Sequence, residues 1–304
     1  MSRARRVLGR GRRALRAGVR ELLHPSPPPT LVEPPKPTPR GVTLSDGRIM
    51  CEHPVAGHMI VDGYCLLVTP RVLMGNYEPA VTAFLRDAVQ PGDVVVDIGA
   101  NQGFHTLTLG MRVLPDGHVW AFEPHPRSRR ILEDNVASNF LHHAVSVIEA
   151  AAWSSDGELT FRARTGESAG SYLRDAFTIP GDRAEGEDLL VRTIDTGAFL
   201  AGLPSPPRLI KLDAEGSETT ILRSAADALR AHHPTVVLEV LRSTFGSDDE
   251  IDDWEQWLRD LGYDIAYLDH LDVARPLERG TFRTLQHGIE AVLWVPGGRG
   301  ALRT

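Results

Sequence analysis

The chain has 304 residues, of which 42% are hydrophobic and 24% charged, a composition typical of a folded globular protein. Residues 1–40 carry ten lysines and arginines against two acids, whereas the remaining residues carry 23 against 38, a net charge of −15. This acidic body argues against nucleic acid as the main partner, because phosphate binding requires a positive face.

Membrane spans and disulfide frameworks are not expected either. No stretch approaches the ~18 consecutive apolar residues that a membrane span requires. The chain has only two cysteines, Cys51 and Cys65, which favours a reducing compartment. We therefore expect a cytoplasmic protein.

The first 40 residues read as a basic extension. Residues 1–23 place apolar side chains on one face of a helical wheel and arginines on the other, which is typical of an amphipathic helix. Such a helix can make weak contact with an anionic membrane surface or an acidic partner, and the alternative is a solvated tail. Eight prolines between His24 and Arg40 favour a semi-rigid spacer. The sequence predicts a flexible extension over 1–40 and a folded domain over 41–304.

Residues 41–75 predict small β-hairpins, because short apolar runs are interrupted by the turn signals SDG and VDG. Cys51, His53, His58 and Cys65 fall in this region. Their spacing matches no strong zinc pattern, so we expect packing roles and no metal site.

Helices and strands then alternate along the chain. A helix is predicted within 75–93. Residues 154–208 interrupt the alternation of strands and helices, and they predict an inserted region of β-structure and loop. Residues 288–296 predict a final antiparallel edge strand. Further strands are predicted at 94–98, 118–122, 145–150, 209–212, 236–240 and 263–268, and helices at 104–113, 126–139, 217–231 and 250–261. This pattern predicts an α/β fold with a mainly parallel sheet covered by helices on both faces.

The stretch VVVDIGANQGFHTLTLG joins the first of those strands to a helix. Gly99, Ala100 and Gly103 let the backbone approach a ligand, and exposed amides at the helix start favour a carboxylate or phosphate. The dinucleotide pattern G-x-G-x-x-G is absent, since position 101 is Asn101 and no third glycine follows at that spacing. Asp97 at the strand end would repel a pyrophosphate and attract a cationic group. The loop therefore favours a cationic ligand over a dinucleotide.

Glu123 ends the second strand, followed by Pro124, 24 residues after the first glycine of the loop. An acid at this distance can accept hydrogen bonds from both hydroxyls of a ribose. A ribose, a cation and a carboxylate without phosphate describe S-adenosylmethionine better than a dinucleotide. After the third strand, Ala151, Ala152 and Trp153 can border a flat adenine, although Trp153 is equally an ordinary core residue.

The fourth strand carries ionisable residues at its carboxyl end. Lys211, Asp213 and Glu215 alternate, so an extended chain projects them to one side, into a cleft rather than a core. Ser217 is predicted to cap the next helix, with support from Glu218. One alternative is a Lys211–Asp213 ion pair that fixes the strand. Another is a Mg²⁺ ion held by Asp213 and Glu215, although two acids are few for such a site, which favours a metal-free enzyme.

In these motifs the chain resembles the FkbM family of S-adenosylmethionine-dependent methyltransferases. The similar stretches are NYEP, PGDVVVDIGANQGFHTL, GHVWAFEPHPRSRRILEDNVASN, AAWSSDG, LIKLDAEGSETTIL and HPTVVLEV, in that order between about Gly75 and Glu239. The resemblance implies a class I (Rossmann-like) methyltransferase fold and an enzyme that methylates a hydroxyl on a sugar or secondary metabolite. The cofactor positions it implies are Asp97, Gly99, Asn101, Gly103 and Glu123, with the segment Lys211–Glu215 near the reacting centre.

An alcohol acceptor also needs a base. Asp213 or Glu215 could take or position the hydroxyl proton, and His105, one turn into the helix after the glycine loop, is a rival, while His125 could face solvent. Two other functions stay open, a dinucleotide-dependent oxidoreductase and a non-catalytic methyltransferase-like binding module. The missing third glycine and Asp97 count against the first, and the intact acids and glycines count against the second.

Removing residues 1–40 is expected to leave folding and cofactor binding intact. The proline-rich spacer should separate the arginine-rich segment from the folded domain, so few contacts should cross it. Thermal melting of the truncated and full-length proteins checks this. A large drop in melting temperature would show instead that the arginine-rich segment packs on the body.

Overall fold

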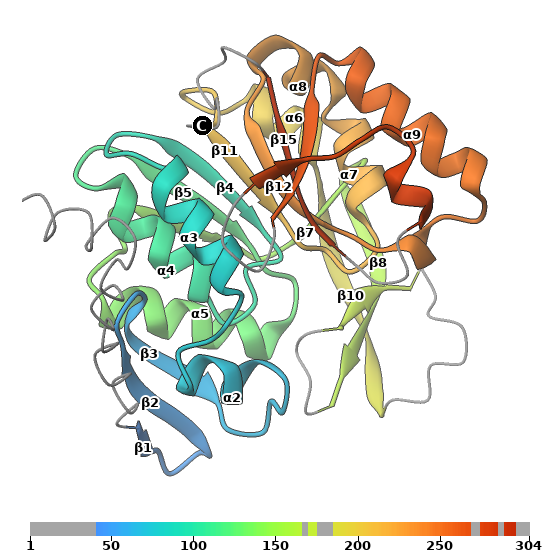
Figure 1. Ribbon diagram of the computed structural model, residues 1–304. Helices are drawn as coiled ribbons and strands as arrows, with labels where there is room; N and C mark the ends of the chain where they lie inside the picture. The colour runs from blue at the N-terminus through green and yellow to red at the C-terminus, as the bar shows by residue number, and fades with distance from the viewer. Residues whose placement is uncertain (1–40, 166–169, 175–184, 269–273, 285–288, 296–304) are drawn as a thin grey trace, which may run out of the picture. The chain divides into compact units, whose positions relative to one another are not determined.

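The computed structural model describes residues 41–165, 170–174, 185–268, 274–284 and 289–295, all of them within one compact unit, residues 38–304 (Figure 1). The amphipathic helix and spacer predicted over residues 1–40 lie outside the described residues. Among the helices of the described ranges, none combines the length and apolar character needed to cross a bilayer.

The amino-terminal region is a three-stranded antiparallel sheet. It consists of β1 (Gly41–Thr43), β2 (Arg48–His53) and β3 (Gly57–Asp62), followed by a short helix α2 (Val68–Leu73) that the sequence pattern did not predict. Cys51 and Cys65 are both buried. The His53 ring accepts hydrogen bonds from the amides of Val55 and Ala56 through its Nδ1 atom. Both observations assign these side chains to packing and turn formation.

Asn135 fastens this sheet to the rest of the domain. Its fully buried amide group accepts a hydrogen bond from the Ile60 amide at 2.6 Å and donates to the Ile60 carbonyl at 2.8 Å. It also donates to the carbonyl of Gln102, in the loop after the first strand of the main sheet. One side chain thus ties β3 to the glycine-rich loop.

The main sheet has eight strands in the order β14-β13-β15-β12-β11-β4-β5-β6. β4, β5, β6, β11 and β12 are parallel, and β15 runs antiparallel between β12 and β13. The strands are β4 (Val94–Ile98), β5 (His118–Phe122), β6 (Val145–Ile148), β11 (Leu209–Leu212), β12 (Thr235–Val240), β13 (Asp264–Leu268), β14 (Ala274–Pro276) and β15 (Ile289–Trp294). Strand order reverses between β4 and β11, which is where ligands bind in open α/β sheets.

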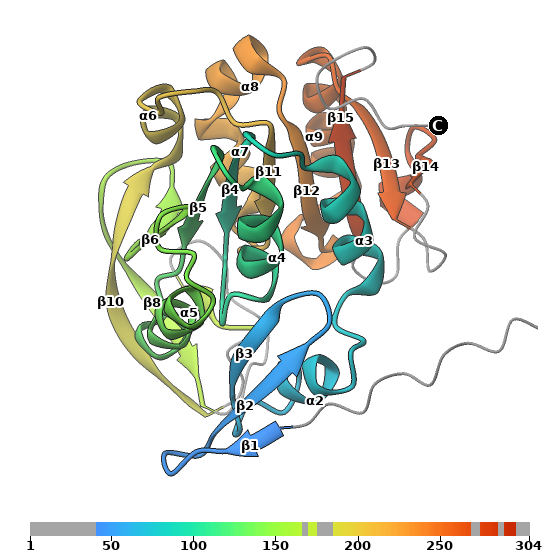
Figure 2. The ribbon, with the colours of Figure 1, turned by 90° about the vertical axis from the view of Figure 1, so that its left-hand side faces the viewer.

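Helices cover both faces of this sheet (Figures 1 and 2). Val95 packs in the core beneath the helices of one face, and its neighbour Val96 packs in the core beneath those of the other. The helices of the first face are α3 (Pro79–Ala88), α4 (Phe104–Val113) and α5 (Pro126–Ser138), and those of the second are α6 (Thr196–Ala201), α7 (Glu218–Ser224), α8 (Ala226–His232) and α9 (Asp248–Asp260). Short 3₁₀ turns lie at Arg242–Thr244 and Thr281–Thr284. The predicted α/β, class I fold is confirmed.

Three local predictions differ from the structure. β15 is antiparallel as predicted, but it is an interior strand, because β13 hydrogen-bonds to the side that β12 leaves open. The helix predicted within 75–93 begins only at Pro79, which occupies its first turn. The helix predicted over 217–231 is two helices separated at Ala225.

The inserted region forms a second sheet. β7 (Ala151–Trp153), β8 (Gly157–Arg164), β9 (Tyr172–Leu173) and β10 (Gly186–Asp195) pair in the order β7-β10-β8-β9. β7 and the end of β10 are parallel neighbours, with Thr193 beside Ala151 and Asp195 beside Trp153. Parts of the loops predicted here, residues 166–169 and 175–184, lie outside the described residues. The chain therefore enters the second sheet on β7 and leaves it on β10, and these two strands are hydrogen-bonded neighbours.

Candidate active site

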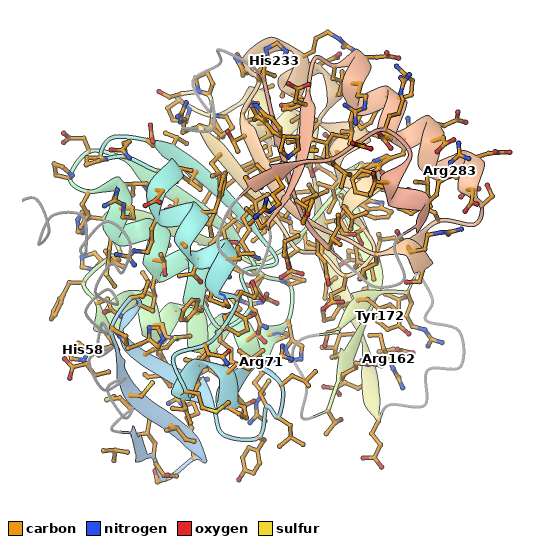
Figure 3. The ribbon with its side chains drawn as sticks, in the orientation of Figure 1. His58, Arg71, Arg162, Tyr172, His233 and Arg283 are labelled. Carbon is orange, nitrogen blue, oxygen red and sulfur yellow. The ribbon has the colours of Figure 1, made fainter. Side chains whose placement is uncertain are left out.

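A cavity of about 220 Å³ opens at the carboxyl ends of β4, β5, β11 and β12. It lies beside the point where the strand order of the main sheet reverses. Arg71 on α2 and Tyr172 on β9 also line it, so the amino-terminal region and the second sheet both contribute to its walls (Figure 3). A smaller hollow adjoins it, lined in part by Asp97, Ala100, His105 and Lys211, and is called the adjoining hollow below.

The glycine loop is shaped by close backbone approach. Gly99 has φ +79°, and a Cβ atom there would overlap the carbonyl oxygen of Asp213 at the end of β11. Gly103 has φ +93°, and a Cβ atom there would collide with Leu132 on α5. Gly99 and Asn101 line the cavity, Ala100 lines the adjoining hollow, and Gly103 lines neither. Gly103 therefore serves the packing of α4 on α5.

The first amides of this loop make hydrogen bonds within the protein. The amides of Gly99 and Ala100 both donate to the carbonyl of Phe122, at 3.1 and 3.0 Å. The Asn101 amide donates to Glu123 Oε2 at 2.6 Å. The loop uses these donors to hold the end of β5, which leaves the Glu123 carboxylate fixed beside the cavity.

Glu123 lines the cavity with an oriented and buried carboxylate. Besides the Asn101 amide, it accepts the His125 amide on Oε1 at 2.7 Å. Burial raises the pKa of Glu123 to about 7, and the two amide hydrogen bonds oppose that rise. Each carboxylate oxygen keeps a second lone pair, so the group can still accept two hydroxyl donors. Pro124 lines the cavity next to it, as predicted.

Only two of the three small or aromatic residues predicted beside adenine reach the cavity. Ala151 and Ala152 line it, whereas Trp153 does not. Trp153 packs half-buried against the core of the second sheet, and its carbonyl accepts the hydroxyls of Thr196 and Ser224. The aromatic rings that do line the cavity come from other elements, namely Phe122, Phe161, Tyr77 and Tyr172.

Asp97 and Lys211 lie side by side on β4 and β11, in register. Asp97 is fully buried and accepts the Thr106 hydroxyl at 2.6 Å, and it faces the adjoining hollow rather than the cavity. Lys211 pairs with Asp213 at 3.2 Å. Burial acts to lower the pKa of the Lys211 ammonium, but Asp213, Asp97 and Glu78 together raise it. The ion-pair alternative is therefore present, and Asp213 lines the cavity all the same.

Glu215 also lines the cavity, from a strained position. Its backbone has φ +48°, and its carboxylate accepts the Gly170 amide at 2.7 Å. Burial, followed by the nearby charge of Asp213, raises the pKa of Glu215 to about 7. Lys211, Asp213 and Glu215 thus do not all project together, because the strand ends at Leu212 and the chain turns.

The predicted cap by Ser217 is wrong. The Ser217 hydroxyl receives no hydrogen bond from the helix, and Glu218 accepts the amides of Ala214 and Gly216, in the turn before the helix, at 2.8 and 2.9 Å. Within the described ranges the buried Ser217 hydroxyl oxygen has no hydrogen-bond partner at all, and Ser217 lines the cavity. Its hydroxyl is available to a ligand.

His105 lies in the adjoining hollow and contacts the cavity only through another residue. Its Nε2 atom is 2.7 Å from Glu78 Oε2, and Glu78 lines the cavity. Burial tends to raise the pKa of Glu78, but the hydrogen bond and charge of His105 lower it to about 2. His125 does not face solvent freely, because its ring accepts the amides of Arg127 and Ser128 at the start of α5.

Two acids that sequence reasoning missed line the cavity as well. Glu239 on β12 and Glu290 on β15 are direct partners across the antiparallel pair. Burial raises the pKa of each to about 8. The sequence signal that could have identified these two residues is a single acid within each apolar strand, in VVLEV and GIEAVLW.

The chain also matches the profile of a known protein family. A profile of the methyltransferase FkbM domain matches residues 97–265, more than half of the chain. No curated protein sequence matches it significantly. A solved FkbM methyltransferase from Methylobacillus flagellatus KT is 18% identical, with a TM-score of 0.43 over 77% of this chain and 56% of that one. A SAM-dependent O-methyltransferase from Thermotoga maritima is 12% identical, with a TM-score of 0.41 over 88% of each chain. A candidate methyltransferase from Streptococcus mutans in complex with SAH is 9% identical, with a TM-score of 0.41 over 70% of this chain and 94% of that one.

Replacing Lys211 by methionine should destabilise the domain. The change leaves the carboxylates of Asp97 and Asp213 without their buried cation, a loss of roughly 3–5 kcal/mol in the free energy of unfolding. Denaturant titration measures it. The matched control is Arg230→Met, which removes an exposed ion pair with Asp227 and should cost no more than about 1 kcal/mol. Equal losses in the two variants would contradict the structural role of Lys211.

Proposed function

The chain belongs to the FkbM methyltransferase family, and on that premise we propose that it transfers a methyl group from S-adenosylmethionine to a hydroxyl group on a sugar or secondary metabolite. One observation carries the proposal: a single cavity at the strand switch point holds Glu123 on one side and Asp213 on another, with the glycine loop between their strands. These are the parts that a ribose-bearing cofactor and a hydroxyl acceptor require.

The residues on the β4 and β5 side of the cavity fit the cofactor. Glu123 offers two free lone pairs to the ribose hydroxyls, and the backbone of Gly99 lines the cavity beside it. Ala151 and Ala152 leave space for a flat base, with Phe161 nearby in the wall. When bound, S-adenosylmethionine supplies the methyl group on a positively charged sulfur.

Asp97 has a different role in this proposal from the one its position in the sequence suggested. It is fully buried in the adjoining hollow, where it accepts the Thr106 hydroxyl and lies beside Lys211. It therefore supports the cofactor loop from beneath. Its second carboxylate oxygen has no hydrogen-bond partner among the described residues and can receive a donor through the hollow.

The residues on the β11 side handle the acceptor. Asp213 is held by Lys211, and in the proposal it takes or orients the proton of the hydroxyl that attacks the methyl group. Glu215, anchored by the Gly170 amide, is the second candidate. His105 positions Glu78 rather than acting as the base. The chain thus contributes approach geometry and a proton acceptor.

Two simple measurements distinguish a methyltransferase from the two other functions that the sequence left open. Thermal shifts with S-adenosylhomocysteine and with NADH distinguish the methyltransferase from a dinucleotide-dependent oxidoreductase. A methyl-transfer assay distinguishes the enzyme from a binding module that keeps the fold without turnover. We expect stabilisation by S-adenosylhomocysteine alone, and stabilisation by NADH alone would overturn the proposal.

The variant Glu123→Ala is expected to bind S-adenosylhomocysteine roughly 10–150-fold more weakly, a loss of about 1.5–3 kcal/mol, because the charge-assisted contacts to the ribose disappear. Calorimetry measures the affinity. Glu133→Ala, at an exposed position on the neighbouring helix α5, is the control and should bind normally. Unchanged affinity in a folded Glu123→Ala protein removes the ribose assignment.

The variant Asp213→Asn keeps the shape of the side chain but cannot accept a proton, so turnover should fall by ~10²–10⁴-fold. Affinity for S-adenosylhomocysteine should change little, since the ribose contacts lie on the first two strands. Glu215→Gln is the comparison, and loss of turnover in that variant alone reverses the two roles. If both variants turn over a hydroxyl acceptor at the wild-type rate, the base lies elsewhere.

A further inference from the structure

Glu239 and Glu290 point to the same side of the main sheet. Leu238 and Val240 pack into the core beneath α7 and α9, and strand residues alternate between faces, so Glu239 faces the opposite side. Glu290 is its direct cross-strand partner and faces the same way. Both side chains line the cavity at the carboxyl end of β12. The structure therefore places two carboxylates against each other in one wall.

This pair lacks the neutralising partners that the other acids of the cavity possess. Asp213 has Lys211, Glu78 has His105, and Glu123 has two backbone amides. In the described part of the chain, neither Glu239 nor Glu290 has an ion pair or hydrogen bond. Like charges placed directly opposite in a sheet are destabilising. Protons on the carboxylates or a bound cation would relieve this repulsion.

A second observation also points to a ligand in this cavity. The Ser217 hydroxyl lines the cavity, is 1% exposed and has no hydrogen-bond partner among the described residues. A buried hydroxyl without a partner is costly in a finished structure. A polar ligand that brings both a positive charge and hydrogen-bonding groups satisfies Ser217 and the glutamate pair together.

When Glu239 and Glu290 are ionised, the cofactor alone does not balance the charge of the cavity. S-adenosylmethionine carries a net charge of about +1 at neutral pH, as follows from the reference pKa values of its amino and carboxyl groups and its fixed sulfonium. Among the residues that the structure describes, Glu215, Glu239 and Glu290 have no cationic partner within ion-pair distance. Arg71 lines the cavity too, but its side chain is exposed on α2, where solvent screens it (Figure 3). A cationic group on the acceptor would supply further positive charge at this wall.

The pKa values of Glu239 and Glu290 are consistent with a carboxylate pair that has no cation beside it among the described residues. Burial, and then neighbouring carboxylates, raise the pKa of Glu239 and Glu290 to about 8, so both hold protons at neutral pH. The charged groups that act on Glu239 are Asp213, Glu290, Glu215 and Glu218, and those on Glu290 are Glu78, Asp213 and Glu218, with Lys211 acting in the opposite direction. A bound cation would release these protons.

Aromatic rings favour an organic cation. Tyr77 and Tyr172 line the same cavity, and Tyr77 lies close enough to Glu290 and Asp213 for their charges to raise the pKa of its phenol. Burial is the largest cause of that rise. Carboxylates combined with tyrosine faces are typical of sites that bind ammonium groups.

We propose that the methyl acceptor is an amino alcohol, such as an amino sugar, whose protonated amine binds between Glu239 and Glu290 while its hydroxyl faces Asp213. This inference rests on the proposed function, because it names the acceptor class of the same site.

The test uses full-length protein saturated with S-adenosylhomocysteine and two matched probes, glucosamine and N-acetylglucosamine, which differ in the charge of the amine. Calorimetry should show glucosamine binding at least roughly tenfold more tightly. Glu239→Gln and Glu290→Gln should each remove most of that preference. Glu52→Gln, at an exposed position on β2, is the control and should keep it.

Proton release is a second readout. At about pH 6.5 the amine and both glutamates are protonated, so binding of glucosamine should expel protons from the pair, and the measured heat should change with the ionisation enthalpy of the buffer. The affinity should rise as the pH increases from about 6, because the pKa of the pair is lower with the cation bound than without it, and should fall again once the amine of glucosamine itself loses its proton.

Equal binding of the two probes, or no binding of either, overturns the inference, as does an unchanged preference in both glutamine variants. Magnesium chloride is the third probe, and Mg²⁺ binding that depends on Glu239 and Glu290 would identify a metal site instead. Binding of S-adenosylhomocysteine by every variant shows that the cavity is intact. Its failure in the wild-type protein contradicts the proposed function itself, so the two failures are distinguishable.

Discussion

The close approach of the glycine loop to the ends of its two neighbouring strands is the constraint on which the rest of the site depends. At Gly99 the chain passes so near the Asp213 carbonyl that no side chain fits. On the other side, the loop amides hold the Phe122 carbonyl and the Glu123 carboxylate. One turn therefore joins the strand end that carries Glu123 to the strand end that carries Asp213, and fixes the separation between the two halves of the cavity.

A second constraint is the distribution of charge around that turn. The domain brings many acids to one edge of the sheet and neutralises each in a different way, with Lys211, His105 or backbone amides. Neutralisation by residues that lie outside the cavity, in the adjoining hollow, keeps Asp213 and Glu78 facing inward without blocking the space. Glu239 and Glu290 are the exceptions, since neither has such a partner among the described residues, and this difference is the basis of the proposed binding of a cationic acceptor.

The sequence predicted the parts of this site that depend on local order along the chain. Gly99, Glu123 and Asp213 follow three parallel strands, and parallel strands bring their carboxyl ends to one rim. Glu290 was not predictable in this way, because β15 inserts between β12 and β13 in the opposite direction and its register is set by pairing rather than by local pattern. The same limit explains Trp153, an aromatic residue next to two alanines of the cavity whose own side chain packs with the second sheet. Ser217 stands at the N-cap position of α7 without a capping hydrogen bond, and Glu218 binds the amides of the preceding turn instead.

The way the second sheet is attached has a consequence for how this domain can diversify. The first and last strands of the second sheet, β7 and β10, are hydrogen-bonded neighbours. The chain enters the second sheet on β7 and leaves it on β10. The hairpin strands between those two points can therefore lengthen, shorten or exchange their residues without shifting the register of β4, β5 or β11. Phe161 and Tyr172, which line the cavity, belong to this exchangeable segment, whereas Glu123 and the glycine loop do not. Relatives can thus inherit one half of the pocket unchanged and remodel the opposite wall independently.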